Sequence, residues 1–158
     1  MDCYTHNADE TQAIGSALAH TALPGDVLWL HGELGAGKTE MTKGIAAGLA
    51  SDDPVSSPSF ALIHEYHGGR LPLFHIDLYR LDGDAALDLG LEEYLEGAGL
   101  TVIEWGERLP DDFFRDGIDV EIAYVDTSDE RRIRLRPRGL AGEAWLARAA
   151  SLLLGRLS

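Results

Sequence analysis

The sequence predicts an α/β fold in which helices flank a mixed β-sheet. Three observations lead to this prediction. A short apolar run, residues 26–30, is typical of a buried strand, and it leads through a glycine-rich stretch into a helical pattern. Further strand-like and helical segments follow in the second half of the chain. The 158 residues, 45% of them hydrophobic, suffice for one compact core, so we expect a single domain spanning residues 1–158.

Two expected helices stand on either side of the apolar strand. Asn7 and Glu10 form a capping signal, after which apolar residues recur at helical spacing until Pro24 ends the pattern. The strand of residues 26–30 comes next. Apolar residues then recur at every fourth position over residues 41–49, which predicts the second helix.

The spacing of apolar residues and the positions of turn-forming residues predict the remaining elements. They are, in order, a turn-rich loop (51–58), a β-hairpin (59–66 and 71–79), a short helix (within 84–95), a buried strand (100–104), a second strand pair (118–125 and 131–136) and a final alanine- and leucine-rich helix (142–157). The sequence contains no internal repeat or low-complexity tract.

Composition excludes several classes of protein. The formal net charge of −14 repels a phosphate backbone, so any role with tRNA or other nucleic acid is expected to be indirect. The single cysteine excludes an internal disulfide and a cysteine metal cluster. No apolar run of membrane-spanning length and no signal-peptide pattern occur, so we expect a cytoplasmic protein without a membrane role.

A complete phosphate-binding motif, G-x-x-x-x-G-K-[ST], lies between the strand and the second helix. Its residues are Gly32, Glu33, Leu34, Gly35, Ala36, Gly37, Lys38 and Thr39. In such a P-loop the glycines let backbone N–H groups point at the β-phosphate, and the helix N-terminus adds a favourable dipole. Lys38 supplies a charge for the β- and γ-phosphates, and the Thr39 hydroxyl can ligate Mg²⁺. We therefore expect a P-loop NTPase-like fold that binds a nucleoside triphosphate with Mg²⁺.

Magnesium held through phosphates usually needs a further carboxylate at the end of a core strand. Asp77 ends the strand-like run of residues 73–76, and Glu104 ends that of residues 100–103. Either residue can hold the metal, directly or through water, while the other positions the attacking water. We therefore predict Lys38, Asp77 and Glu104 as catalytic residues.

Three neighbouring features allow more than one interpretation. Trp105 either lies against the nucleotide or packs in the core. His75 fits a packed or surface histidine better than a metal ligand, because no second histidine stands at ligand spacing. The segment Ser57-Pro58-Ser59 either responds to the γ-phosphate or forms a plain proline turn.

Charged residues cluster at two further places. Residues 131–138 contain five arginines, and four of them share one face of the predicted strand: Arg132, Arg134, Arg136 and Arg138. This arginine stripe is either the solvated face of an edge strand or a docking face for a phosphate or an acidic partner. The acidic residues of the short helix form a solvated face: Glu92, Glu93 and Glu96.

The nucleotide is expected to be ATP. Guanine-specific P-loop proteins usually read the base with an Asn-Lys-x-Asp element, but the two lysines, Lys38 and Lys43, stand in no such element and the only asparagine is Asn7. A small-molecule kinase needs a lid or a substrate-binding insertion, and the core elements leave little of the chain for one. The favoured interpretation is a minimal ATPase acting with another protein; a free-standing small-molecule kinase is the alternative.

Four blocks of sequence, in order and spacing, resemble the TsaE (YjeE) family. They are the P-loop, Ser57-Pro58-Ser59-Phe60, His75-Ile76-Asp77-Leu78-Tyr79-Arg80-Leu81 and Ile103-Glu104-Trp105. The family consists of small bacterial P-loop ATPases needed to make N6-threonylcarbamoyladenosine (t6A) in tRNA. The resemblance extends from about residue 9 to about residue 135.

The resemblance implies a particular site and particular partners. It implies that Thr39 and Glu104 ligate Mg²⁺ and that Asp77 is required for hydrolysis. The implied ATP contacts are Gly32 to Glu40, Trp105 and Arg131. Family members act with two partner proteins, TsaB and TsaD, so the chain is implied to be a Mg²⁺-dependent ATPase, weak alone, that resets the complex between rounds of transfer onto tRNA.

The chain departs from the family pattern at residue 40, where a small hydroxyl residue is usual. Glu40 adds negative charge at the helix end that meets phosphates, so we expect weaker or slower nucleotide binding, with the Glu40 side chain turned outward. A third, non-enzymatic function also remains open, namely a nucleotide-sensing module whose hydrolysis is incidental.

Overall fold

A computed structural model describes residues 1–33, 35–51, 63–79, 90–110, 113, 115–126 and 129–154 of the chain. Its strands are β1 (Asp2–Thr5), β2 (Val27–Gly32), β3 (Ile63–Tyr66), β4 (Leu73–Asp77), β5 (Leu100–Glu104), β6 (Gly117–Tyr124) and β7 (Arg131–Arg138). Its helices are α1 (Ala8–Thr21), α2 (Lys38–Gly48), α4 (Leu91–Leu95), the short 3-10 helix η1 (Gly106–Arg108) and α5 (Gly139–Leu154). No helix in the described ranges is long and apolar enough to cross a membrane.

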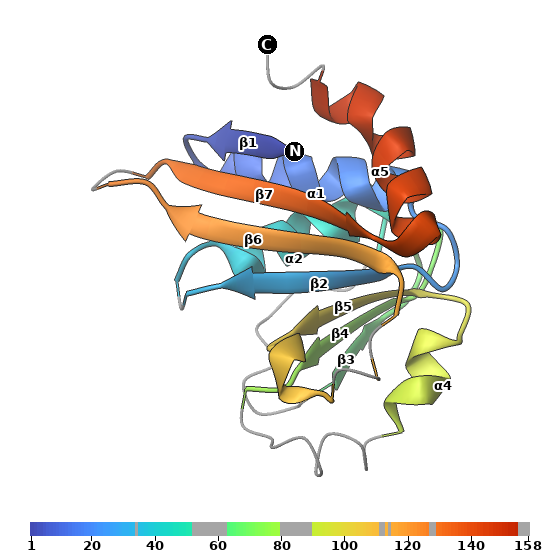
Figure 1. Cartoon of the computed structure of the whole chain (residues 1–158). Coiled ribbons are helices and arrows are strands. Elements are labelled where there is room, and N and C mark those ends of the chain that lie inside the picture. The colour runs from blue at the N-terminus through green and yellow to red at the C-terminus, as the bar shows by residue number, and fades with distance from the viewer. Residues whose placement is uncertain are drawn as a thin grey trace.

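These seven strands form one sheet in the order β1-β7-β6-β2-β5-β4-β3 (Figure 1). The central strands β6, β2, β5 and β4 are parallel to one another, whereas β1, β7 and β3 are antiparallel to the strands beside them. The α/β fold with a mixed sheet is therefore confirmed. Both predicted strand pairs are found, β3 with β4 and β6 with β7.

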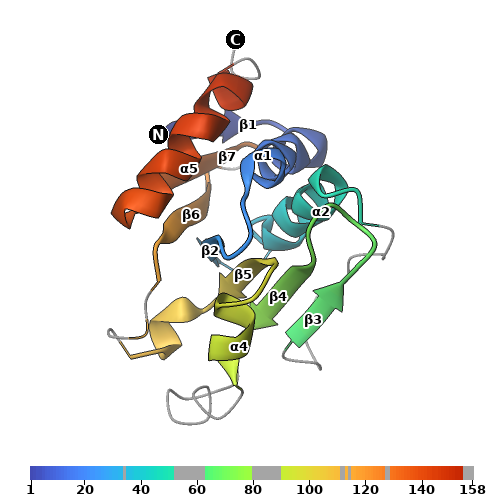
Figure 2. The same cartoon turned by 90° about the vertical axis from the view of Figure 1, so that its right-hand side faces the viewer.

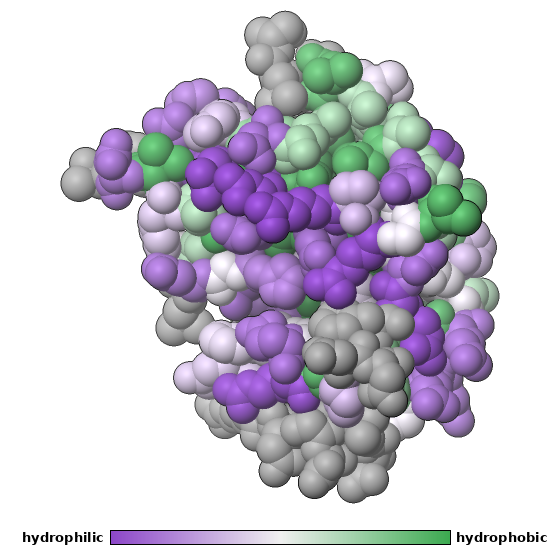
Figure 3. Space-filling view, viewed as in Figure 1, coloured by the Kyte–Doolittle hydropathy of each residue, from purple (hydrophilic) through white to green (hydrophobic). Residues whose placement is uncertain are grey.

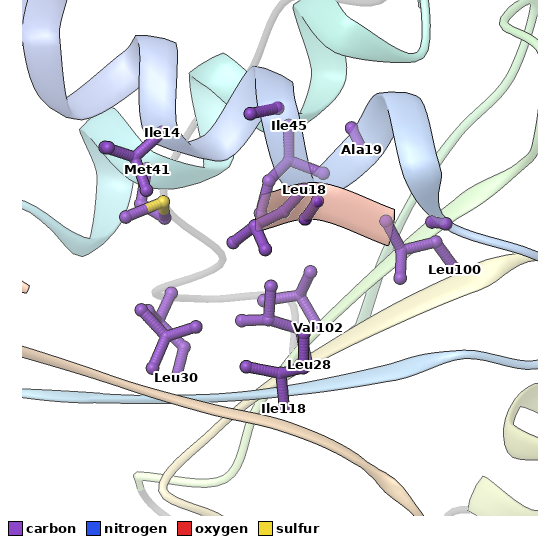
Figure 4. Packing of buried hydrophobic residues seen from close by; sticks show 14 of the residues in the cluster. Ile14, Leu18, Ala19, Leu28, Leu30, Met41, Ile45, Leu100, Val102 and Ile118 are labelled. Atoms are coloured by element: carbon purple, nitrogen blue, oxygen red, sulfur yellow. The ribbon is translucent and has the colours of Figure 1, made fainter. Parts of the chain in front are cut away.

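Helices cover the two faces of the sheet unequally (Figure 2). α1, α2 and α5 pack on one face and share with the strands the larger of two buried cores. α4 lies on the other face, over a smaller core. Figure 4 shows the larger core, in which side chains of α1 and α2 lie over those of β2, β5 and β6: Ile14, Leu18, Met41 and Ile45 over Leu28, Leu30, Val102 and Ile118.

β2 is apolar on both sides because it lies near the middle of the sheet. Leu28 and Leu30 face the larger core, whereas Val27 and Trp29 face the smaller one, and all four are completely buried. A central parallel strand is covered on both faces, which explains the uninterrupted apolar run in the sequence. The glycine-rich stretch begins at the carboxyl end of β2, where the chain leaves the core.

The first helix begins where the capping signal predicts, but the strand before it is not predicted. The Asn7 side chain accepts a 2.8 Å hydrogen bond from the Glu10 backbone N–H, so Asn7 is the N-cap of α1. β1 has only four residues, too few for a periodic pattern, and its conformation depends on antiparallel pairing with β7.

The presence of β1 corrects one interpretation of the arginine stripe. β7 lies between β1 and β6, so the stripe does not belong to an edge strand. Ile133 and Leu135 face the larger core, so the stripe lies on the opposite, open face, where Figure 3 shows a strongly hydrophilic band. Two of its arginines are ion-paired across strands, Arg134 with Asp2 (3.2 Å) and Arg138 with Asp119. Docking of a partner on this face stays a prediction.

Several expected segments lie partly outside the described residues. These include Leu34, almost all of the turn-rich loop with Ser57-Pro58-Ser59, and residues 84–89 of the predicted short helix. Residues 91–95 are helical, and the three glutamates of this region are exposed as expected: Glu92, Glu93 and Glu96. The final helix begins at Gly139, three residues before the predicted start.

Glycine at position 44 allows α1 and α2 to pack closely. A Cβ atom at Gly44 would lie 2.0 Å from the carbonyl oxygen of Gln12. We expect Gly44→Ala to lower the free energy of unfolding by about 2 kcal/mol, because this overlap outweighs the ~1 kcal/mol by which alanine favours a helix. Urea denaturation measures the change. Lys43→Ala, at an exposed site of the same helix, is the control and should change the value by less than about 0.5 kcal/mol; an equally small change for Gly44→Ala would contradict the close packing.

Candidate nucleotide-binding site

The glycine-rich loop joins the end of β2 to the start of α2. Gly35 and Gly37 have φ values of 79° and 120°, a left-handed backbone that favours glycine. Gly37 is also the N-cap of α2, and no side-chain hydrogen bond caps that helix. The backbone N–H groups of its first turn, which holds Lys38 and Thr39, can therefore receive an anionic ligand.

The parallel strands bring the two predicted carboxylates to this loop. Asp77 at the end of β4 and Glu104 at the end of β5 are direct neighbours in strand register. β5 is in turn parallel to β2, so the carboxyl ends of all three strands lie at the edge of the sheet where the loop begins. The structure thus gathers Lys38, Asp77 and Glu104, which are far apart in the sequence, at one place.

Glu104 is the centre of a buried charge network. Its side chain is only 8% exposed; Oε1 lies 3.4 Å from Nζ of Lys38, and Oε2 lies 2.5 Å from Nε2 of His75 in a hydrogen bond. Burial acts to raise the pKa of Glu104, but the hydrogen bond from His75 and the charge of Lys38 outweigh it and hold the pKa below its ordinary value. Glu104 is therefore an anionic oxygen donor at neutral pH.

Asp77 has a different environment from its neighbour Glu104. It is partly buried, and its Oδ1 accepts a 2.9 Å hydrogen bond from the backbone N–H of Tyr79. Burial raises the pKa of Asp77 above its ordinary value; the Tyr79 hydrogen bond opposes this shift, and the negative charge of Glu104 adds to it. Asp77 consequently takes up a proton more readily than Glu104, which suits a group that orients a water molecule.

The donors at this site suit magnesium. Thr39 offers a hydroxyl, and Asp77 and Glu104 offer carboxylates, which are the hard oxygen ligands that Mg²⁺ prefers. Within the described ranges, no three histidine, cysteine or acidic side chains converge into a metal site of their own. An ion here would complete its coordination with phosphate oxygens and water, as Mg²⁺ commonly does beside a nucleotide.

Trp105 connects the lysine to the smaller core. Its φ of 62° is a strained, left-handed conformation for a tryptophan. The ring packs partly against the smaller core, lies 5.0 Å from the Tyr79 ring, and has Nζ of Lys38 at 5.4 Å from its centre. Arg108 approaches the same ring at 5.6 Å. Trp105 therefore packs against the core and also lies beside the lysine of the loop.

A pocket of about 330 Å³ opens on the other side of the loop. Nε of Arg131 donates a 3.0 Å hydrogen bond to the carbonyl oxygen of Ala36, and the Arg131 guanidinium lies 4.3 Å from the centre of the Tyr124 ring. Polar groups from several elements thus converge in a volume that suits a small ligand. The residues that line the pocket are Asn7, Ala8, Thr11, Gly35, Ala36, Gly37, Glu40, Asp129 and Arg131.

Glu40 points toward α1, not outward as expected from the sequence. Its Oε2 accepts a 2.6 Å hydrogen bond from Nε2 of Gln12, and Nζ of Lys43 lies 3.2 Å from Oε1. The Gln12 hydrogen bond lowers the pKa of Glu40 most, and Lys43 adds to the effect against a smaller opposing effect of burial. The carboxylate is thus ionised, and its charge is balanced locally by Lys43.

Two residues of this site have roles that were not predicted from the sequence. His75 is 1% exposed and so is a packed histidine, as expected, but it also holds Glu104. A signal existed, because His75 stands two residues before Asp77 and so shares its face of β4. Gln12 carries no such signal, since it reaches Glu40 from a different helix.

Comparison with known proteins places these residues in a family. The sequence profile described as "Threonylcarbamoyl adenosine biosynthesis protein TsaE" matches residues 5–133. The chain is similar to the "tRNA threonylcarbamoyladenosine biosynthesis protein TsaE" of Bacillus subtilis (strain 168), with 45% identity over 129 residues, 82% of this chain and 80% of that protein. The protein of the same name from Streptomyces coelicolor is 39% identical over 148 residues, 90% of this chain and 98% of that one.

A solved structure shows the same similarity in three dimensions. The crystal structure of YdiB from Bacillus subtilis superposes with a TM-score of 0.78 at 37% sequence identity. The superposition covers 96% of this chain and 94% of that one. The seven-stranded sheet and its helices therefore have a close experimental counterpart.

Proposed function

Because this chain belongs to the TsaE family, we propose that it binds and hydrolyses ATP in support of the threonylcarbamoyladenosine (t6A) modification of tRNA. The observation that carries the proposal is the convergence of Lys38, Asp77 and Glu104 at one glycine-rich loop. The names of the relatives indicate the pathway, and the loop with its carboxylates can carry out a reaction that suits this pathway.

In this proposal the loop and Lys38 hold the phosphates. Backbone N–H groups at the start of α2 face the β-phosphate, and Lys38 exchanges its contact with Glu104 for contacts with the β- and γ-phosphates. Oε1 of Glu104 would then be available, and together with the Thr39 hydroxyl it would hold Mg²⁺. When bound, the metal neutralises charge that develops on the transferred phosphoryl group.

Asp77 is proposed to orient the water that attacks the γ-phosphorus. Its Oδ1 is held by the Tyr79 N–H, which leaves Oδ2 to accept a hydrogen bond from the water. Attack forms the bond from the water oxygen to phosphorus and breaks the bond to the ADP oxygen, and the water proton passes to Asp77 or to solvent. The raised pKa of Asp77 suits this brief acceptance of a proton.

The pocket beside the loop is proposed to take the adenosine half of ATP. It borders Gly35, Gly37 and Glu40, whose backbone N–H groups would face the phosphates, and Asn7 and Arg131 also line it. Because Glu40 carries a negative charge at this border, we expect ATP to bind less tightly than in a variant with serine at residue 40.

We further propose that the protein acts with homologues of TsaB and TsaD and meets tRNA only indirectly. The net charge of −14 makes tight binding of a bare phosphate backbone by this chain unfavourable. ATP binding and hydrolysis would then regulate chemistry that takes place on the partner proteins.

Measurement of t6A tests the proposal. The t6A content of tRNA is measured by mass spectrometry in cells with and without this protein, and affinity purification shows whether TsaB and TsaD homologues accompany it. We expect t6A to fall in its absence and to return with the wild-type gene. Normal t6A in cells that lack the protein would refute the proposal.

Asp77→Asn separates an ATPase from a nucleotide-sensing module. We expect this variant to bind ATP nearly as well as the wild type, because Asp77 acts on water, but to hydrolyse it about 100-fold more slowly. Calorimetry and phosphate release measure the two properties. If cells with a non-hydrolysing Asp77→Asn protein still have normal t6A, the protein senses nucleotide and its hydrolysis is incidental.

A screen of phosphoryl acceptors tests the alternative, a free-standing small-molecule kinase. With no partner protein present, we expect no small-molecule acceptor to raise ADP release above the slow rate of hydrolysis. A many-fold increase with one acceptor would favour the kinase.

Tryptophan fluorescence is expected to report nucleotide binding through a single residue. Of the three tryptophans, Trp29 and Trp145 are completely buried, whereas Trp105 is only partly buried and lies beside Lys38. Movement of Lys38 toward phosphates should therefore change the emission of Trp105. We expect the change on adding ADP to disappear in Trp105→Phe, while calorimetry still detects binding; a change that persists would assign the signal elsewhere.

A further inference from the structure

We infer that His75 is a positioning residue, which holds the Glu104 carboxylate in the orientation that receives nucleotide-bound Mg²⁺. The inference rests on the proposed function, in which Glu104 is a metal ligand. It adds a residue that acts through Glu104 and contacts neither the nucleotide nor the metal.

Strand geometry places His75 behind Glu104. His75 lies in register with Val102 on β5, so Glu104 is its diagonal neighbour, two residues further along. Long side chains on one face of a sheet can reach such a neighbour, and here Nε2 and Oε2 are 2.5 Å apart. Both residues are buried on core strands, so the contact lies inside the fold.

The environment of His75 determines which ring nitrogen carries the proton. An ionised carboxylate can only accept a hydrogen bond, so Nε2 of His75 must be the donor to Glu104. Nδ1 is buried and has no hydrogen-bond partner among the described residues. A proton on Nδ1 would therefore be a buried donor without an acceptor, which is costly. The N–H that the ring donates to Glu104 is therefore the one on Nε2.

This hydrogen bond leaves Glu104 with a single oxygen for the loop. His75 occupies Oε2, and Oε1 faces Lys38 at 3.4 Å. When Lys38 moves to the phosphates, Oε1 stays in place and need not be ordered again at the moment of metal binding. Outer partners of this kind orient metal ligands in many proteins, and their loss commonly costs about 10- to 100-fold in metal affinity.

Two substitutions at residue 75 and one nearby control test the inference. His75→Leu fills the buried position with an apolar side chain and removes the donor. His75→Gln retains an N–H donor that can reach Glu104. Leu73→Ala is the control, because Leu73 is a buried residue on the same face of β4 that does not hold Glu104. The affinity for ADP is measured by calorimetry in EDTA and again with Mg²⁺, and the unfolding free energy of each variant is measured in parallel.

We expect His75→Leu to lower the Mg²⁺ affinity of the ADP complex about 10- to 100-fold and to leave ADP affinity in EDTA nearly unchanged. His75→Gln should recover most of the loss, and Leu73→Ala should lose stability but keep its response to Mg²⁺. The inference is overturned if His75→Leu responds to Mg²⁺ as the wild type does, or if its ADP affinity falls equally with and without the metal.

Two further outcomes keep the inference separate from its premise. If the wild-type protein itself shows no Mg²⁺-dependent nucleotide binding, the proposed function fails, whatever His75 does. If His75→Leu does not fold, nitrogen NMR of the wild-type ring decides: a proton on Nε2 that is hydrogen-bonded to Glu104 supports the inference, and an Nε2 without a proton overturns it.

Discussion

Lys38→Ala is expected to lower the affinity for ATP by at least about 100-fold. The lysine would supply charge-assisted contacts to two phosphate groups, each worth about 1.5–3 kcal/mol, and every 1.4 kcal/mol is a factor of ten. Its removal also leaves the negative charge of Glu104, which now faces Lys38 at 3.4 Å, directed at the phosphates. Isothermal titration calorimetry with ATP and Mg²⁺ measures the loss.

The chain offers a matched control for this prediction, because its only other lysine lies five residues later in the same helix. Lys43 is 44% exposed and contacts Glu40. Lys43→Ala removes the same charge from α2, so any general effect of net charge would appear in both variants. We expect Lys43→Ala to change ATP affinity less than about threefold. Equal effects of the two substitutions would contradict the specific role of Lys38.

Glu104→Gln is expected to separate nucleotide binding from metal-dependent hydrolysis. Glutamine has nearly the same shape and can still accept the hydrogen bond from His75, so the fold should persist. The variant lacks the anionic ligand, so we expect ATP hydrolysis with Mg²⁺ to fall about 100-fold or more. ADP affinity in EDTA should hold or increase, because a negative charge near the phosphates is gone. Phosphate release and calorimetry measure the two effects.

Glu107→Gln is the control for the Glu104 prediction. Glu107 lies three residues later in η1, and its side chain is 57% exposed. The substitution removes the same charge near the site but not from the network around Lys38. Hydrolysis by this variant should remain close to that of the wild type. If Glu104→Gln kept the wild-type dependence on Mg²⁺ concentration, Glu104 would not be a metal ligand.

Local sequence was enough to predict the loop and the elements around it. The P-loop motif is contiguous. The apolar run before it and the helical spacing of apolar residues after it can each be recognised in a short stretch of sequence. The same holds for Asn7, whose partner Glu10 is three residues away. Asp77 and Glu104 could be selected because strand ends are visible in sequence, and parallel strands must end at a common edge.

Contacts between distant segments could not be predicted in this way. β1 is a strand because β7 pairs with it, across about 130 residues of chain, and that pairing makes β7 an inner strand of the sheet. The Glu40 side chain contacts Gln12 because α1 packs against the first turn of α2. Arg131 supports the loop through Ala36, 95 residues earlier, a contact that no spacing in the sequence indicates.

By itself, the sequence determined the α/β class, the order of most elements and the chemistry of the loop. These depend on the spacing of apolar side chains and on one contiguous motif. Tertiary structure decided how that chemistry is arranged. Only the parallel register of β2, β5 and β4 sets Asp77 beside Glu104, and only the diagonal across two strands gives Glu104 its hydrogen bond from His75. Distances between segments that are far apart in the chain follow from packing of the whole core, so no local pattern of residues predicts them.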